Sequence, residues 1–403
     1  MNRRIVITGL GVISSIGIGW REFWKNLLDG KSGISPVSSF DTTNHFTHNG
    51  GEVRDYDPEQ LIDGNKLNLI SRASQFAVSA AKLALEDANL SAEKYQNTRF
   101  GVCIGTTLGS VQNVEIMNDL DIKHGQSSIT RELIYQVPTH STSAAIAKEF
   151  DFQGPNIMFS TACAAGNYAI GYGFDLIRLE KADIMLVGGS DPFSKVAFTG
   201  FNQLSAVAPD KCQPFDKNRR GMMVAEGAGI LVLESLEGAL KRNAHIYAEI
   251  LGYGLSCDAN HMTQPSVEGM SACMIKAMNT AGIGKENVDY VSAHGTGTLV
   301  NDRTECAAIK EVFGETYGNI PVSSIKSMLG HTMGAASAIE AIACALAITN
   351  NMIPPTINFE TPDTECDIDC VPNHARRHTV NIALNNSYAF GGNNACLVSK
   401  KFI

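Results

Sequence analysis

Two stretches of the chain, far apart in sequence, share one pattern: a short apolar strand, a sharp turn, and a helix of small residues. The first covers residues 157–179 and the second covers residues 322–347. Each turn carries a reactive side chain, Cys163 in the first and His331 in the second. The stretches share a pattern rather than identical residues, as an ancient duplication would leave them. We therefore expect two similar halves that meet near the middle of the molecule.

Apolar runs of β type alternate with Ala-rich helical segments along the whole chain, and this alternation predicts a layered α/β fold. The clearest helix is expected at residues 71–88, where Phe76 and five alanines lie on one stripe. Strands are expected at residues 5–8, 101–105, 184–188, 230–233, 290–293, 322–325, 381–384 and 396–399.

The composition supports a globular chain, because 44% of the 403 residues are hydrophobic and 18% are charged. A net charge of −9 argues against a nucleic-acid binder, which needs a basic surface. No run of 18 uncharged apolar residues occurs, so no membrane-spanning helix is expected. Glycines interrupt the apolar stretch at residues 5–19, which favours a strand over a signal peptide.

Ten irregularly spaced cysteines predict free thiols in a reducing, cytoplasmic environment. Cys366, Cys370, His374 and His378 follow one another at four-residue steps, which on a helix would suit a zinc site. Pro372 lies inside this run and disfavours a helix. We therefore predict irregular chain and no metal.

Cys163 lies in a segment of small residues where a strand ends and a helix begins. A thiol at a helix N-terminus feels the positive end of the dipole and unpaired N–H groups, which favour the thiolate. The small neighbours leave room for a substrate to approach. Cys163 is therefore the predicted nucleophile.

Two histidines also follow predicted strands. His294 enters a loop of glycines and threonines, which permits close backbone approach and offers hydroxyls to an amide-rich ligand. His331 lies at the mouth of a helix expected to begin near Gly334, where the dipole keeps the imidazole neutral. Its Nε2–H could then bind an oxyanion. Lys326 is expected at a strand end, in an ion pair with Glu305.

Phe390 precedes paired glycines after the strand expected at residues 381–384. An aromatic side chain in this position could swing to close a pocket, and the alternative is a simple β-turn.

These motifs, in this order, resemble the β-ketoacyl-acyl carrier protein synthase family, and most closely its synthase II members. The resemblance runs from residues 4–9 to the C-terminal strand and includes residues 258–263 and 355–358. It implies an α/β, thiolase-like fold of two similar halves in a layered α-β-α-β-α architecture. The N-terminal half, residues 1–250, would carry the nucleophile, and residues 251–403 would carry both histidines.

The resemblance implies a role for each reactive residue. Cys163 would take an acyl chain from a carrier thioester, and loss of CO₂ from malonyl carrier would give an enolate that His294 and His331 stabilise. The enolate would attack the acyl group and give a β-ketoacyl carrier. Lys326 and Glu305 would support the site. No metal or organic cofactor is implied.

The resemblance also implies substrate-binding residues. The N–H groups of Cys163 and Phe390 would form an oxyanion hole, and Phe390 would be the gate. Leu108 would line the acyl pocket, and Arg72 would dock the carrier. Pantetheine would be bound by Thr263, Thr296 and Thr298, and further docking candidates are Lys66, Arg219 and Arg220.

The implied partners are an acyl carrier protein with its phosphopantetheine arm and either a second copy or a chain-length-factor subunit.

Three departures from the family pattern favour a specialised polyketide or unusual fatty-acid pathway: Ala389 replaces a gate glycine, Arg220 replaces an acidic residue, and Ser292 replaces an asparagine. Two alternatives are a non-catalytic chain-length factor, which Cys163 argues against, and a cysteine hydrolase of another fold.

Overall fold

The computed structural model describes residues 3–91 and 99–403, whose strands form an 11-stranded sheet and two small sheets. The first half of the large sheet contains β1 (Ile5–Ser14), β5 (Phe100–Gly105), β6 (Asn156–Phe159), β7 (Ile184–Asp191) and β8 (Gly227–Ser235), with β2 (Gly17–Ile18) paired to β1. The second half contains β9 (Ala248–Cys257), β10 (Tyr290–Ser292), β11 (Val322–Ser323), β14 (Ile382–Tyr388) and β15 (Asn393–Lys400). The small sheets pair β3 (Ser35–Pro36) with β4 (Asn49–Gly50), and β12 (Met352–Ile353) with β13 (Arg376–Arg377).

The strand order repeats about the centre of the large sheet. It runs β6-β5-β7-β8-β1 and continues β9-β15-β14-β10-β11, so each strand of one half has a counterpart in the other. β1 and β9 join the halves through only three residue pairs, from Ile5–Ile250 to Ile7–Ala248. This topology confirms the two similar halves of the expected thiolase-like fold.

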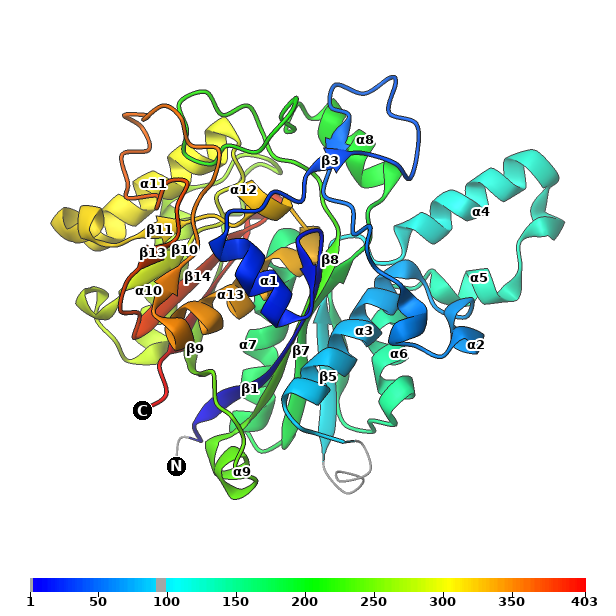
Figure 1. Cartoon of the computed structure of the whole chain (residues 1–403), viewed down its shortest axis with the longest axis horizontal. Coiled ribbons are helices and arrows are strands. Elements are labelled where there is room, and N and C mark those ends of the chain that lie inside the picture. The colour runs from blue at the N-terminus through cyan, green and yellow to red at the C-terminus, as the bar shows by residue number, and fades with distance from the viewer. Residues whose placement is uncertain (1–2, 92–98) are drawn as a thin grey trace.

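The helices and the two halves of the large sheet together form five layers (Figure 1). α7 (Ala165–Arg178) and α13 (Ala336–Asn350) contact each other and strands of both halves, so they form the middle layer. α3 (Arg72–Asp87) covers the outer face of the first half, and α10 (Val267–Ala281) covers that of the second beside α11 (Leu299–Phe313). The layers are therefore α-β-α-β-α, as expected.

The middle-layer helix α13 is strongly apolar. With the turn before it, the segment Met333–Asn350 is long and apolar enough to cross a membrane, but 89% of it is buried inside the protein. It forms part of the core between the two halves.

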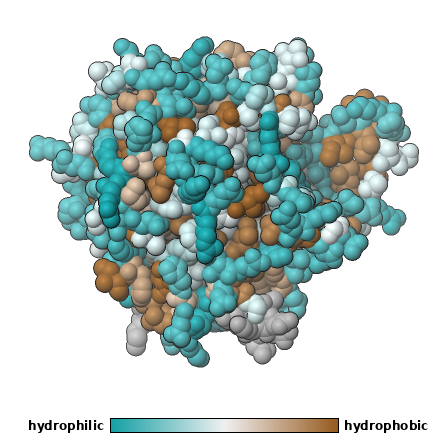
Figure 2. Space-filling model, viewed as in Figure 1, coloured by the Kyte–Doolittle hydropathy of each residue, from teal (hydrophilic) through white to brown (hydrophobic). Residues whose placement is uncertain are grey.

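The remaining helices lie at the periphery, apart from one short buried helix, Lys326–Leu329. They are α1 (Trp20–Leu28), α2 (Gly64–Leu67), α4 (Val111–His124), α5 (Arg131–Gln136), α6 (Ser141–Phe150), α8 (Lys195–Gln203), α9 (Leu236–Lys241) and α12 (Lys326–Leu329). α4 and α5 project from the body of the molecule (Figure 1), and hydrophobic residues gather on this projection (Figure 2). The exposed large apolar side chains there are Val114, Ile116, Ile122, Ile134 and Tyr135.

All eight expected strands are present, with different bounds. The first is longer than expected because Gly9 and Gly11 continue it under α3: a Cβ on Gly11 would lie 1.8 Å from the carbonyl oxygen of Ala80. The strand expected at residues 322–325 ends at Ser323, where the chain turns toward α12. The expected helix at residues 71–88 is α3, capped by Ser71.

β9 is not among the strands expected from the sequence, although it lies at the centre of the large sheet. Two glycines interrupt its apolar run, and they allow α10 to pack closely. A Cβ on Gly254 would lie 2.3 Å from the carbonyl oxygen of Cys273. Tertiary packing therefore decides this strand more than local pattern does.

Candidate active site

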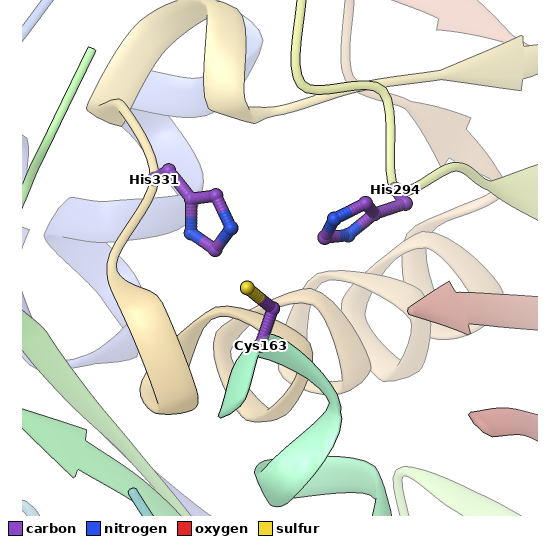
Figure 3. Close-up of side chains that lie close together, drawn as sticks. All are labelled: Cys163, His294 and His331. Carbon is purple, nitrogen blue, oxygen red and sulfur yellow. The ribbon is translucent and has the colours of Figure 1, made fainter. Parts of the chain in front are cut away.

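Cys163, His294 and His331 come from three separate segments and meet in one place (Figure 3). Cys163 lies in the 3₁₀ turn before α7, His331 just before the matching turn and α13, and His294 follows β10. The thiol sulfur and one nitrogen of each ring all lie within 4.8 Å of one another. The two ring centroids are 5.4 Å apart, with the ring planes nearly perpendicular at 84°.

The two turns that carry these residues have the same backbone geometry. Ala162, one residue before Cys163, has φ 49°, and Met333, two residues after His331, has φ 52°. Residues other than glycine rarely adopt this left-handed region, and such strain is common at functional sites. A small residue also lets the second turn approach the end of β5, because a Cβ on Gly334 would lie 2.5 Å from the backbone of Thr106. The repeated pattern in the sequence therefore corresponds to a repeated structure.

The thiol of Cys163 has a higher pKa than its position before a helix suggests. Burial raises its pKa to about 12, although the charge of Lys326 and the N–H groups of Cys163 and Phe390 lower it. Removal from water outweighs the helix end, because a thiolate needs more compensation than these groups supply. The expectation of a resting thiolate is therefore wrong. The two N–H groups directed at the sulfur are those expected in the oxyanion hole.

Both imidazoles are buried and neutral. Burial lowers the pKa of His331 well below its usual value, and the charge of Lys326 adds to this effect. Burial, Lys326 and His331 lower the pKa of His294 in the same way. In His331, Nδ1 accepts a hydrogen bond from the N–H of Met333 at 3.1 Å, so the neutral ring carries its proton on Nε2. The ring can therefore donate from Nε2, as expected.

Lys326 does not pair with Glu305. Its ammonium bonds the carboxylate of Glu340 on α13, and both side chains are fully buried. Glu305 instead accepts hydrogen bonds from the N–H groups of His294 and Gly295, each at 2.8 Å. The prediction of a Lys326–Glu305 ion pair is therefore wrong, because the carboxylate of Glu305 binds the backbone N–H groups of the His294 loop. A signal for Glu340 existed, since it is the single charged residue of α13.

A cavity of about 320 Å³ opens above the three reactive residues. Thr296 and Thr298 line it, and their hydroxyls lie 2.9 Å apart. Thr263 and Phe390 line it as well, and the ring centroid of Phe390 lies 5.8 Å from that of Phe201 on α8. The structure thus brings the expected pantetheine residues and gate to the same cavity as Cys163.

Leu108 is not among the residues that line this cavity. Its N–H donates to Asp191 at 3.2 Å. The same carboxylate accepts from the N–H groups of Thr107 at 2.7 Å and Gly334 at 2.6 Å. Asp191, which the sequence reasoning missed, therefore ties the segment of Leu108 to the turn after His331.

Two of the expected docking residues are engaged inside the protein. Arg72 donates to both carboxylate oxygens of the buried Glu226, at 2.8 and 2.6 Å. Arg219 is buried and paired with Asp363, so its suggested role on the surface is wrong. Lys66 bonds Glu149 at 2.8 Å, whereas Arg220 is exposed at the edge of the cavity. Arg220 is therefore the best placed of these cations.

The backbone of the segment that carries Phe390 accommodates Ala389, where the family pattern has glycine. Ala389 is extended, with φ −107° and ψ 155°, so its Cβ causes no strain in this state. Gly391 and Gly392 have φ 82° and 77°, which favour glycine. The N–H of Gly391 donates to the carbonyl of Met262 at 2.8 Å, which links the gate to the loop that carries Thr263.

The run of cysteines and histidines at residues 366–378 is irregular chain with one short strand and no helix, as predicted. Cys366 and Cys370 are buried, but His374 is exposed. Within residues 3–91 and 99–403, Cys163, His294 and His331 form the only cluster with metal-ligand spacing.

A buried thiol between two neutral imidazoles, at the junction of two duplicated halves, can accept an acyl group and stabilise an enolate. This arrangement defines a condensing enzyme of the thiolase-like class. The chain matches the models for the Beta-ketoacyl synthase N-terminal domain over residues 2–239 and C-terminal domain over residues 247–360. It belongs to the beta-ketoacyl synthase family.

Individual relatives agree with this assignment over their full length. The chain is 40% identical to a 3-oxoacyl-[acyl-carrier-protein] synthase 2 of Synechocystis sp., over 99% of this chain and 98% of that protein. It is 44% identical to a solved structure of the ishigamide ketosynthase/chain length factor, with a TM-score of 0.97 and full coverage of both chains. A type II PKS ketosynthase solved with its acyl-carrier protein is 36% identical, with a TM-score of 0.92 and full coverage of both.

Proposed function

We propose that this enzyme condenses an acyl group held on Cys163 with malonyl-acyl carrier protein, releasing CO₂ and forming a β-ketoacyl carrier. One observation carries the proposal: a single thiol lies within 4.8 Å of nitrogens of two buried, neutral imidazoles. A cysteine hydrolase needs one base and an orienting partner, whereas an enolate is best stabilised by two donors. The non-catalytic alternative is not favoured, because Cys163 is present and faces the cavity.

In the first half-reaction, the sulfur of Cys163 attacks the acyl thioester of the carrier. The thiol proton leaves as the sulfur attacks and passes to the sulfur of the departing carrier. The tetrahedral oxyanion would be stabilised by the N–H groups of Cys163 and Phe390, which are directed at the sulfur in the resting state. The C–S bond to the carrier then breaks, and the carrier leaves as its thiol.

In the second half-reaction, malonyl carrier occupies the same cavity. Its C–CO₂ bond breaks, and the electron pair forms a thioester enolate whose oxygen receives hydrogen bonds from His294 and His331. The enolate carbon attacks the acyl carbonyl, the C–S bond to Cys163 breaks, and the released sulfur takes up a proton from solvent to restore the thiol. Glu305 would hold the backbone of the His294 loop, and Lys326 with Glu340 would hold the helix behind His331.

The substrate arm would enter through the open side of the cavity. The paired hydroxyls of Thr296 and Thr298 and the side chain of Thr263 are placed to bind the amides of pantetheine. Phe390 would move when the acyl chain arrives, and Leu108 would line the space for that chain. Arg220, rather than Arg72, would contribute positive charge to docking of the acidic carrier, because Glu226 already neutralises Arg72.

A specialised polyketide pathway is the better-supported context. The ishigamide protein is more similar to this chain in sequence, at 44%, than the cyanobacterial synthase 2, at 40%. The apolar projection of α4 and α5 and the edge strand β6 support assembly with a second subunit, either another copy or a chain-length factor. The halves would divide at residues 1–250 and 251–403, and the enzyme would act in the cytoplasm without nucleic acid.

Intact-mass analysis with a panel of acyl carriers tests the function. Incubation with an acyl carrier should add one acyl mass to the protein, and later addition of malonyl carrier should remove it and yield a β-ketoacyl carrier. Release of free acid without a condensed product would indicate a hydrolase and contradict the proposal.

A further inference from the structure

Two neighbouring side chains at the active site each keep a polar atom buried and unpaired. Among the described residues, neither Nδ1 of His294 nor the hydroxyl of Tyr388 has a hydrogen-bond partner. Their ring centroids lie 6.1 Å apart, with the planes at 76°, and both residues line the cavity. Burying an unpaired hydroxyl costs free energy that a phenylalanine would not, so its presence beside the reacting groups calls for a reason.

His294 differs from His331 in one respect. The N–H of Met333 holds the proton of His331 on Nε2 through its bond to Nδ1. The backbone N–H groups at His294 and Gly295 are both taken by Glu305, so they cannot serve Nδ1 of His294. Because the ring is neutral, a donor at Nδ1 would keep its proton on Nε2.

We propose that Tyr388 positions His294: its O–H donates to Nδ1, directly or through one water, and thereby keeps the imidazole proton on Nε2. This inference rests on the proposed condensation, in which Nε2–H of His294 must donate to the enolate oxygen. Tyr388 does not itself touch the reacting atoms. It acts through the imidazole, as the backbone of Met333 does for the other histidine.

The surroundings of Tyr388 support its role as a donor. Burial raises the pKa of its hydroxyl well above the usual value, and the nearby carboxylate of Glu305 raises it further. The hydroxyl therefore stays protonated and able to donate. Glu305 also accepts a hydrogen bond from the backbone N–H of His294, so its carboxylate lies close to both residues.

Nuclear magnetic resonance of protein labelled with ¹⁵N-histidine tests the inference without reference to activity. The shifts of Nδ1 and Nε2 distinguish the two tautomers, and loss of signals in His294→Ala assigns them. Wild-type protein should show His294 protonated on Nε2, with a hydrogen-bonded Nδ1. In Tyr388→Phe, these shifts should move toward a mixture of tautomers, and decarboxylation of malonyl carrier should fall about tenfold. Acyl transfer to Cys163 should fall much less.

Tyr247→Phe is the matched control, because Tyr247 is also buried but bonds Asp87 at 2.9 Å, far along the chain from the site. It should leave the His294 shifts and the decarboxylation rate unchanged. Either a wild-type ring protonated on Nδ1 or unchanged shifts in Tyr388→Phe would overturn the inference. Failure of wild-type protein to decarboxylate malonyl carrier would instead count against the proposed function.

Discussion

Lys326 and Glu340 form an ion pair that is fully closed to solvent and links the start of α12 to the second turn of α13. Breaking such a pair leaves an uncompensated buried charge, which typically costs about 3–5 kcal/mol. Lys326→Ala should therefore lower the free energy of unfolding in urea by about that amount. A double variant, Lys326→Met with Glu340→Leu, should recover most of the loss. Equal instability of the single and double variants would show that packing, not charge, dominates.

Substitutions at Cys163 and at His331 should affect different half-reactions. Cys163→Ala should remain folded but form no acyl adduct by intact mass, because the sulfur is the acyl acceptor. His331→Ala should still accept an acyl group, but it should fail to condense because the enolate loses one of its two donors. An adduct on another cysteine of the Cys163→Ala protein would show that the nucleophile is misassigned.

Arg220 and Arg72 should respond differently to charge reversal. Arg220 is exposed at the cavity edge, so Arg220→Glu should raise the KM for the carrier roughly fivefold at low salt and change kcat little. The difference should shrink at high salt, because exposed charges are screened. Arg72→Glu should instead lower stability by about 3 kcal/mol, since it leaves the buried Glu226 facing a like charge. Equal KM values for wild-type and Arg220→Glu protein would exclude docking at this edge.

The turns that carry Cys163 and His331 could be predicted from sequence because local pattern decides them. Small residues around Cys163 and before α13 specify a strand, a turn and a helix, and these elements appear as expected. Properties that depend on tertiary contacts could not be predicted. The partner of Lys326 depends on how α13 crosses the turn, and the high pKa of Cys163 depends on burial by both halves.

Leu108 provides a test of the acyl pocket. Leu108→Phe adds volume near the segment that Asp191 holds, without touching the nucleophile. If Leu108 lines the space for the acyl chain, long donors should lose reactivity and short donors should keep it. Competition between short and long acyl carriers, read by intact mass, measures the preference. An unchanged ratio would place the acyl chain elsewhere.

Glu305 should make stability depend on pH. Burial raises its pKa to about 7, although the N–H groups of Gly295 and His294 lower it. Because the folded pKa lies above the unfolded value near 4.5, the folded protein binds the proton more tightly. The stabilisation is fully present below pH 4.5 and is lost as pH rises through about 7. From this shift, the contribution is on the order of 3 kcal/mol.

Glu305→Gln removes this titration while keeping an acceptor for one of the two N–H groups. Urea unfolding at pH values from 4.5 to 8 should therefore show a shallower decline for the variant than for wild-type protein. Asp191, whose pKa burial raises to about 6, and Glu340, at about 7, remain in both proteins and supply the common slope. Parallel curves for the two proteins would mean that Glu305 ionises with its ordinary pKa, held as a carboxylate by the backbone of the His294 loop.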